Sequence, residues 1–185
     1  MPLSNTLESL LRQDRLRWQA IEHVAALGLP DCWVAAGFVR NAVWDDLHGR
    51  PVSAPATDID VIWFDSARAE AMFDLEQEAR LRALDPLSDW SVKNQARMHI
   101  KKQRPPYRSC ADAMRDWPET ATAVGVRLSA GNRLEVLAPW GLDDLFAGIL
   151  RPPPTYAEDW FPIFRQRVEE KQWMMSWPEL LLVDA

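Results

Sequence analysis

The chain has 185 residues, of which 48% are apolar, enough for one well-packed domain with little left over for a second. Its net charge of −6 excludes a basic module that coats nucleic acid, so any nucleic-acid contact must be a local patch. The two cysteines, Cys32 and Cys110, form no CxxC motif, which argues against a zinc ribbon or a redox site. No long apolar run near the N-terminus resembles a signal peptide or a membrane anchor, so we expect a cytoplasmic protein without membrane contact.

Hydrophobic periodicity predicts a mixture of helices and short strands. Two prolines in six residues predict a loop over 51–56. We predict an α+β fold in which flanking helices cover a small mixed β-sheet, with residues 1–150 as the main domain and residues 151–185 as a helical extension packed on it. In chain order the expected elements are a helix over 4–27, a strand over 33–36, a helix over 38–47, a strand over 59–64, a helix over 67–84, a strand over 90–92, a helix over 109–117, a hairpin of 121–128 with 133–137, a helix over 141–150 and a final helix over 155–175.

Two carboxylates lie one residue apart at the second predicted strand, in Thr-Asp-Ile-Asp-Val-Ile-Trp-Phe (57–64). Because side chains alternate across a strand, Asp58 and Asp60 point to the same face. Such a pair can bind Mg²⁺ or Mn²⁺ and leave room for substrate phosphates. Solvated turns at strand ends carry the same pattern, so the pair alone does not establish a metal site.

A third carboxylate from a neighbouring strand would strengthen the metal interpretation. Glu135 lies between Leu134 and Val136, in a predicted strand where a lone acid is either an exposed residue beside Arg133 or a ligand. Two further acids, Asp143 and Asp144, are alternatives, although negative charge at a helix N-terminus explains them as well. We expect Glu135 to complete the site.

The run Cys-Trp-Val-Ala-Ala-Gly-Phe-Val-Arg-Asn-Ala-Val-Trp (32–44) predicts a buried strand that turns at Gly37 directly into a helix. Free amide groups at such a turn, from Gly37 and Phe38 onward, can bind phosphate, and Arg40 can add a charge-assisted contact. A tight turn followed by a surface arginine explains the same residues without function. No P-loop, His-Glu-x-x-His, Gly-x-Ser-x-Gly or Gly-x-Gly-x-x-Gly motif is present.

Taken together, the glycine turn, the Val-Arg-Asn helix start and the Asp-x-Asp strand resemble the polymerase-beta-like nucleotidyltransferase superfamily. The Gly-x-Val-Arg pattern is similar to the head of CCA-adding enzymes. The chain resembles still more a family of small bacterial nucleotidyltransferase-like proteins, over most of residues 20–180. That likeness lies in Trp-Ser-Val-Lys-Asn-Gln-Ala-Arg-Met-His (90–99), Trp-Pro-Glu-Thr-Ala-Thr-Ala-Val-Gly-Val-Arg-Leu (117–128) and Leu-Glu-Val-Leu-Ala-Pro-Trp-Gly-Leu-Asp-Asp-Leu (134–145).

The resemblance implies that Asp58, Asp60 and Glu135 are the catalytic metal-binding acids and that Gly37 begins the phosphate-binding helix. The sequence departs from the superfamily pattern at two positions. Ala36 stands where a glycine is usual, which hinders close backbone approach to the triphosphate. Asn41 stands where an acid usually follows Val-Arg, so one charge is missing near the site.

A local basic strip crosses the middle of this acidic chain. It contains no acid, and its members are Lys93, Arg97, Lys101, Lys102, Arg104 and Arg108. We interpret Lys93, Asn94 and Arg97 as nucleotide-binding residues and the later cations as contacts for a phosphate-bearing acceptor. A solvated loop that balances acidic neighbours is the alternative.

The sequence therefore predicts a metal-dependent nucleotidyltransferase that moves an NMP unit from an NTP, expected to be ATP, to an unidentified hydroxyl of an RNA, a protein or a small molecule. Asp58, Asp60 and Glu135 would bind the metal, while Gly37, Phe38, Arg40, Asn41, Lys93, Asn94 and Arg97 would bind the nucleotide. A non-catalytic nucleotide- or RNA-binding protein on the same scaffold is the alternative. A tryptophan-rich adaptor, which would bind no nucleotide, is a third possibility.

Overall fold

The computed structural model of the chain describes residues 2–51, 58–155 and 161–183. Most of the loop predicted over 51–56 and the first part of the final helix predicted over 155–175 lie outside these ranges. All statements below concern the described residues.

The N-terminal region forms two helices, α1 (Leu3–Gln13) and α2 (Arg15–Ala25), rather than the single helix predicted over 4–27. The break is at Asp14, whose backbone is extended and whose carboxylate accepts hydrogen bonds from the amides of Leu16 and Arg17. The same carboxylate pairs with the buried Arg17 guanidinium. A helix cap therefore interrupts a hydrophobic periodicity that continues through it.

Five strands form the central sheet, in the order β3-β2-β1-β4-β5. Strand β1 is antiparallel to both β2 and β4, β4 is antiparallel to β5, and β2 is parallel to β3. The parallel pair requires a crossover, which helix α4 (Ala71–Leu84) provides after the short 3-10 turn η1 (Ser66–Arg68). The strand bounds are β1 Trp33–Ala35, β2 Ile59–Trp63, β3 Trp90–Asn94, β4 Gly125–Leu128 and β5 Leu134–Leu137.

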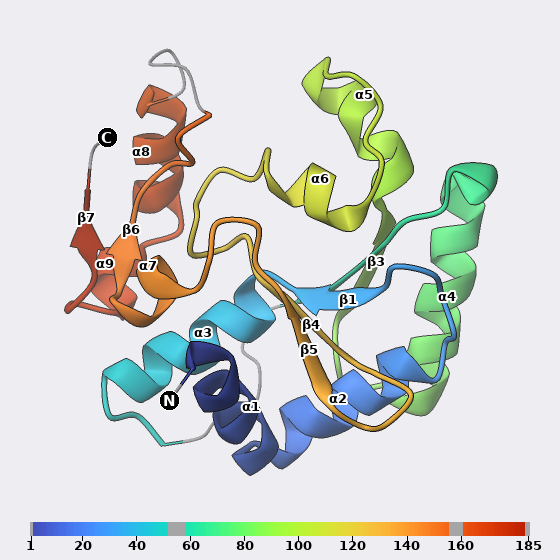
Figure 1. Cartoon of the computed structure of the whole chain (residues 1–185), viewed down its shortest axis with the longest axis horizontal. Coiled ribbons are helices and arrows are strands. Elements are labelled where there is room, and N and C mark those ends of the chain that lie inside the picture. Colours follow the sequence, from blue (N-terminus) through green and yellow to red (C-terminus); the bar gives the residue numbers. More distant parts are fainter. Residues whose placement is uncertain (1, 52–57, 156–160, 184–185) are drawn as a thin grey trace.

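The two faces of the sheet have different partners. Alternation sends Val61 and Trp63 of β2 into the main core, with α2, α3 (Gly37–Leu47) and α4. Ile62 points to the other face, where Cys110 and Met114 of α6 (Cys110–Met114) cover it. Asp60 has the same parity as Ile62, so its carboxylate lies on the α6 side of the sheet. Figure 1 shows α5 and α6 on one side of the strands and α1 and α2 on the other.

The chain between β3 and β4 is mostly helix and turn. The 3-10 turn η2 (Gln95–Arg97) leads into α5 (Met98–Lys102), and α6 follows. Strand β4 is shorter than the hairpin strand predicted from Ala121, because residues 119–124 form turns closed by hydrogen bonds from the amides of Thr122 and Ala123 to the carbonyl oxygen of Glu119.

The C-terminal part of the chain packs against α3. After α7 (Asp143–Phe146), strand β6 (Ile149–Leu150) pairs with β7 (Leu181–Leu182), while α8 (Phe161–Glu170) and α9 (Trp173–Ser176) lie between them in sequence. Phe164, Trp173 and Trp177 belong to the same core as the sheet. In Figure 1 these elements stand beside α3, at the opposite end of the molecule from α4.

The predicted fold class is confirmed: the chain has an α+β architecture in which helices flank a mixed five-stranded sheet. In the described part of the chain, no helix combines the length and apolarity needed to cross a bilayer.

Candidate active site

Strand β2 brings Asp58 and Asp60 to the edge of one cavity. Asp58 directly precedes the strand and is exposed, whereas Asp60 is half-buried opposite Ala35 of β1. Burial, and then the negative charge of Asp58, raises the pKa of Asp60 to about 6. Within the described residues neither carboxylate forms an ion pair or a side-chain hydrogen bond. Both carboxylates are therefore available to bind a cation.

The turn between β1 and α3 has its unusual backbone at Ala36 rather than at Gly37. Ala36 has φ 55° and ψ −129°, a conformation that a residue with a Cβ rarely adopts. Its carbonyl oxygen accepts hydrogen bonds from the amides of Val39 and Arg40, which starts the helix. Gly37 is the first helical residue. The position where the superfamily pattern expects glycine is thus the one that needs it, and this chain fills it with alanine.

Arg40 is a buried cation in the first turns of α3. Its guanidinium donates to Thr122 Oγ1 at 2.8 Å and to Asn41 Oδ1 at 2.9 Å, both uncharged acceptors. It also stacks against Trp44 and Trp173, with ring centroids at 4.7 and 4.4 Å. Burial lowers the pKa of Arg40 to about 10, which leaves it charged at neutral pH. No carboxylate within the described residues forms an ion pair with it.

These groups meet in a first cavity of about 580 Å³ between β2, the start of α3 and the C-terminal helices. Asp58 and Asp60 lie on one side, and Gly37, Arg40 and Asn41 on another. The described residues that line the cavity carry five cationic and three acidic side chains: Arg17, Arg40, Arg50, Arg167 and Lys171, with Asp45, Asp58 and Asp60. Phe38 is different, because its side chain is 1% exposed and belongs to the core.

A second cavity of about 340 Å³ adjoins the first. The two share four residues, Ala36, Asp60, Thr122 and Arg167. Asp60 therefore lies at the boundary between them. The other described residues that line the second cavity are Ile62, Lys93, Gln95, Met98, Lys101, Lys102, Tyr107, Ala113, Trp117 and Pro118.

Glu135 is not brought to this site. Strands β1 and β4 separate β5 from β2, so about 14 Å of sheet lies between Glu135 and Asp60. Its carboxylate accepts a hydrogen bond from Arg127 Nε at 2.7 Å and lines a separate pocket beside α2. Across the described chain, no three His, Cys, Asp or Glu residues are grouped so that they could hold one ion. The predicted triad does not form, because sequence fixes the face of a strand but not its place in the sheet.

The alternative acids also lie away from this site. Asp143 and Asp144 lie in the first turn of α7. Asp144 accepts a hydrogen bond from Thr120 Oγ1 at 2.7 Å and pairs with Arg151 at 3.1 Å. Neither lines the first or the second cavity.

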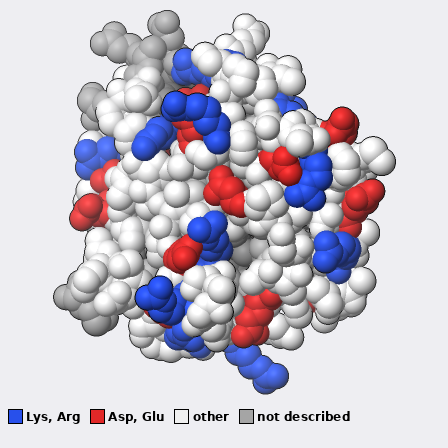
Figure 2. Space-filling view, turned by 45° about the vertical axis from the view of Figure 1, so that its right-hand side comes forward, with Lys and Arg blue, Asp and Glu red and all other residues white. Residues whose placement is uncertain are grey.

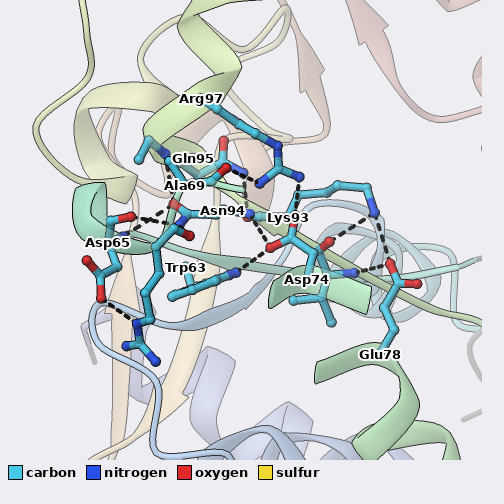
Figure 3. Close-up of polar contacts among 12 residues, drawn as sticks. Trp63, Asp65, Ala69, Asp74, Glu78, Lys93, Asn94, Gln95 and Arg97 are labelled. Atoms are coloured by element: carbon cyan, nitrogen blue, oxygen red, sulfur yellow. Dashed lines mark hydrogen bonds and ion pairs between the residues drawn. The ribbon is translucent and has the colours of Figure 1, made fainter. Parts of the chain in front are cut away.

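Asn94 and Arg97 serve a structural network rather than the cavity (Figure 3). Asn94 is fully buried, and its side-chain Nδ2 donates to the backbone carbonyl oxygens of Asp65 and Arg68, each at 2.8 Å. Arg97 pairs with Asp74 of α4, whose carboxylate also accepts from Trp63 Nε1 at 2.8 Å. Lys93 pairs with Glu78 at 2.9 Å, yet it also lines the second cavity. Only Lys93 of these three predicted nucleotide-binding residues reaches either cavity.

Sequence reasoning missed the contribution of the C-terminal helices. Arg167 lines both cavities, and its Nε donates to Glu119 Oε1 at 2.6 Å. Glu119 is 0% exposed, and its other oxygen has no partner in the described structure. The charges of α8 were indistinguishable from an ordinary solvated helix face. Glu119 lies in the quoted Trp-Pro-Glu-Thr segment, which could have drawn attention to it.

Comparison with known proteins gives the family. A family model described as Nucleotidyltransferase matches residues 22–182. A structure solved by NMR and described as a CCA-adding enzyme head domain is 34% identical, with a TM-score of 0.84 over 96% of both chains. A search of curated proteins found no match.

Two larger enzymes share the fold. A CCA-adding enzyme in complex with CTP is 14% identical with a TM-score of 0.62, over 96% of this chain and 43% of that one. The Thermotoga maritima CCA-adding enzyme in complex with a tRNA is 16% identical with a TM-score of 0.57, over 96% of this chain and 42% of that one. This chain thus spans less than half of either enzyme. The family match over residues 22–182 and the 34% identical head domain decide the assignment: the chain belongs to the nucleotidyltransferase family and is a nucleotidyltransferase.

Proposed function

We propose that the protein transfers an NMP unit from an NTP to a hydroxyl acceptor and that the first cavity binds the NTP with a divalent metal ion. One observation carries the proposal: within the described structure Asp58 and Asp60 form no ion pair, although a group of arginines and a lysine lines the same cavity. Separated charges of both signs suit a ligand that is itself a polyanion with a bound cation.

The donor set fits a hard cation. Asp58 and Asp60 supply carboxylate oxygens from one strand, and Mg²⁺ commonly uses one or two carboxylates together with substrate phosphates. Burial, and then repulsion from Asp58, raises the pKa of Asp60, and a bound cation would offset both effects. When bound, the ion would polarise the α-phosphate and neutralise charge on the pyrophosphate leaving group. With Glu135 absent from the site, the proposed ligands are Asp58 and Asp60.

The residues of the chain have separate tasks in this proposal. Arg40, fixed by Thr122 and by two indole faces, holds its charge toward the triphosphate in a set orientation. Lys171 and Arg167 bring positive charge from the C-terminal helices. Trp173 and Trp177 line the same cavity and supply apolar surface for the nucleoside. Asp58 and Asp60 would hold the metal ion beside the α-phosphate.

The identity of the NTP is part of the proposal. ATP remains our expectation, although a structurally similar CCA-adding enzyme has been solved with CTP. A panel of the four α-³²P-labelled NTPs with Mg²⁺ and cell extract would test transfer directly. We expect wild type to label an acceptor and the Asp58→Asn/Asp60→Asn double variant to lose about 100-fold or more of that activity.

Arg133→Ala is the matched control, because Arg133 is exposed at the β4–β5 hairpin and lines neither cavity. The control should label as wild type does. Equal labelling by wild type and by the double variant would remove the basis for the enzymatic proposal.

A non-catalytic nucleotide-binding protein is the second candidate, favoured by the alanine at the strained turn and by Asn41, whose oxygen is occupied by Arg40. Calorimetry separates the two functions. Transfer through Asp58 and Asp60 predicts that NTP binding weakens when Mg²⁺ is removed, whereas tight NTP binding in EDTA would favour the second candidate.

A further inference from the structure

We propose that the second cavity is the acceptor site and that it takes a small phosphorylated hydroxyl compound. This inference rests on the proposed function, because it assigns the NTP to the first cavity. Asp60 lines both cavities, together with Ala36, Thr122 and Arg167. A hydroxyl bound in the second cavity would therefore lie next to an α-phosphate held at Asp60 in the first cavity.

The charge of the second cavity is nearly all positive. Four cationic side chains line it against one carboxylate: Lys93, Lys101, Lys102 and Arg167, with Asp60. Among the described residues, only Lys93 of the three lysines pairs with a carboxylate. Lys102 donates to the uncharged carbonyl oxygen of Asp116. Lys101 and Lys102 thus have no carboxylate contact among the described residues, and Lys102 keeps further N–H donors beside the one that it gives to Asp116. Phosphate is an anion that lysines commonly bind.

The rest of the lining and the size limit the ligand. Ile62, Met98, Trp117 and Pro118 give the cavity an apolar side. Its volume of about 340 Å³ is at the lower end of the range for small-molecule sites. A compound with a phosphate, a free hydroxyl and a body no larger than a mononucleotide matches these features.

The surrounding surface argues against a long nucleic acid as acceptor. Polyanion binding needs an extended row of cations. Within the predicted basic strip, however, the remaining cations have acidic partners: Arg97 pairs with Asp74, Arg104 with Asp116 and Arg108 with Asp112. On the face drawn in Figure 2, basic and acidic groups are interspersed rather than gathered into a stripe. Of the four cations that line the second cavity, only Lys101 and Lys102 lack a carboxylate partner among the described residues.

The transfer step balances with this assignment. The acceptor hydroxyl oxygen forms a bond to the α-phosphorus of the NTP, and the bond between that phosphorus and the bridging oxygen to the β-phosphate breaks. Pyrophosphate leaves with the electron pair of that bond, and the hydroxyl proton is released to water. No oxidant or further co-reactant is needed.

The test uses the full chain, ¹⁵N-labelled, saturated with Mg²⁺ and α,β-methylene ATP. Ribose 5-phosphate is the probe, ribose is the neutral comparison, and a hexaribonucleotide represents an RNA 3′ end. We expect ribose 5-phosphate, but not ribose, to shift the amide signals of Lys93, Lys101 and Lys102. The Lys101→Ala/Lys102→Ala variant should weaken this binding about tenfold or more, because two charge-assisted contacts are lost. Arg133→Ala should bind as wild type does.

Three outcomes are distinguishable. Shifts confined to the first cavity, or no shifts from ribose 5-phosphate while α,β-methylene ATP still binds, would overturn the acceptor site and leave the proposed function standing. Shifts at the second cavity from the hexaribonucleotide alone would overturn the small-molecule assignment in favour of RNA. Failure of α,β-methylene ATP to perturb the first cavity would count against the proposed function itself.

Discussion

Two polar regions of this protein treat charge in opposite ways. Around α4, both oxygens of the buried Asp74 carboxylate have donors, which are Trp63 Nε1, the backbone N–H of Asn94 and the Arg97 guanidinium (Figure 3). In the first cavity, no described residue donates a hydrogen bond to the Asp60 carboxylate, and the described hydrogen-bond acceptors of Arg40 are uncharged. Buried charge that is fully satisfied holds elements together, whereas charge left unsatisfied beside a cavity is available to a ligand.

The largest expected effect is on the satisfied region. Asp74→Ala would leave the Arg97 cation, the Trp63 indole N–H and the Asn94 amide without their acceptor. We expect a loss of about 3–5 kcal/mol in the free energy of unfolding, the usual cost of removing one partner from a buried ion pair. Urea denaturation measures it. A loss below about 1 kcal/mol would mean that this network does not anchor α4.

Asp60→Asn should have the opposite sign for stability. The pKa of Asp60 is raised from 3.8 to about 6 in the folded protein, so the folded state holds this proton more tightly than the unfolded state does. The resulting stability is fully present below pH 3.8 and is lost as pH rises through about 6. The metal-free variant should therefore be up to about 3 kcal/mol more stable than wild type at pH 8, and no more stable at pH 4.

Thermal denaturation in EDTA at the two pH values provides the measurement. In a chain of this size about 3 kcal/mol corresponds to roughly 6–12 °C. Unlike Asp74→Ala, this variant should gain stability while it loses transfer. An equal shift at pH 4 and pH 8 would show that ionisation of Asp60 is not the cause.

These contrasting regions also show what the sequence could predict. Strand alternation is local, and it predicted that Asp58 and Asp60 share a face; both line the first cavity, although Asp58 directly precedes β2. The position of Glu135 depended on strand order, which is set by long-range pairing and left β1 and β4 between the acids. Asn94 was predicted to bind nucleotide for a related reason. The partners of its side chain, the carbonyl oxygens of Asp65 and Arg68, are distant in sequence, so the sequence did not show that this amide is used inside the protein.

The contribution of α8 was hidden for another physical reason. Arg167 becomes distinctive only because the turn after Pro118 places a buried carboxylate against it, and neither residue carries a local pattern of function. The fold class, in contrast, followed from periodicity and from the length of the apolar runs. Local chemistry was predictable here, while convergence of distant segments was not.

Glu119→Gln tests whether the buried carboxylate positions Arg167. The substitution keeps the shape but weakens the contact to Arg167, whose side chain is 34% exposed and can be solvated instead. We expect a stability change of only about 1 kcal/mol, with NTP affinity reduced several-fold because Arg167 is no longer held at the boundary of the cavities. Calorimetry with ATP and Mg²⁺ measures the affinity, and Glu119→Asp should recover part of it. Unchanged affinity in Glu119→Gln would leave the carboxylate a purely structural role.

The smallest effect concerns the backbone between the two regions. Ala36 holds φ 55° and ψ −129° at the start of α3, a conformation that costs about 1–3 kcal/mol for a residue with a Cβ. Ala36→Gly removes that strain, but it also gives the unfolded chain more freedom, which offsets part of the gain. We expect a net stabilisation of about 1 kcal/mol and, because both cavities adjoin this residue, closer approach of a phosphate to the amides of α3.

Urea denaturation and ATP calorimetry measure the two effects. Tighter ATP binding without stabilisation would mean that the Ala36 side chain obstructs the ligand rather than straining the turn, and a loss of stability would show that the turn is relaxed with alanine in place.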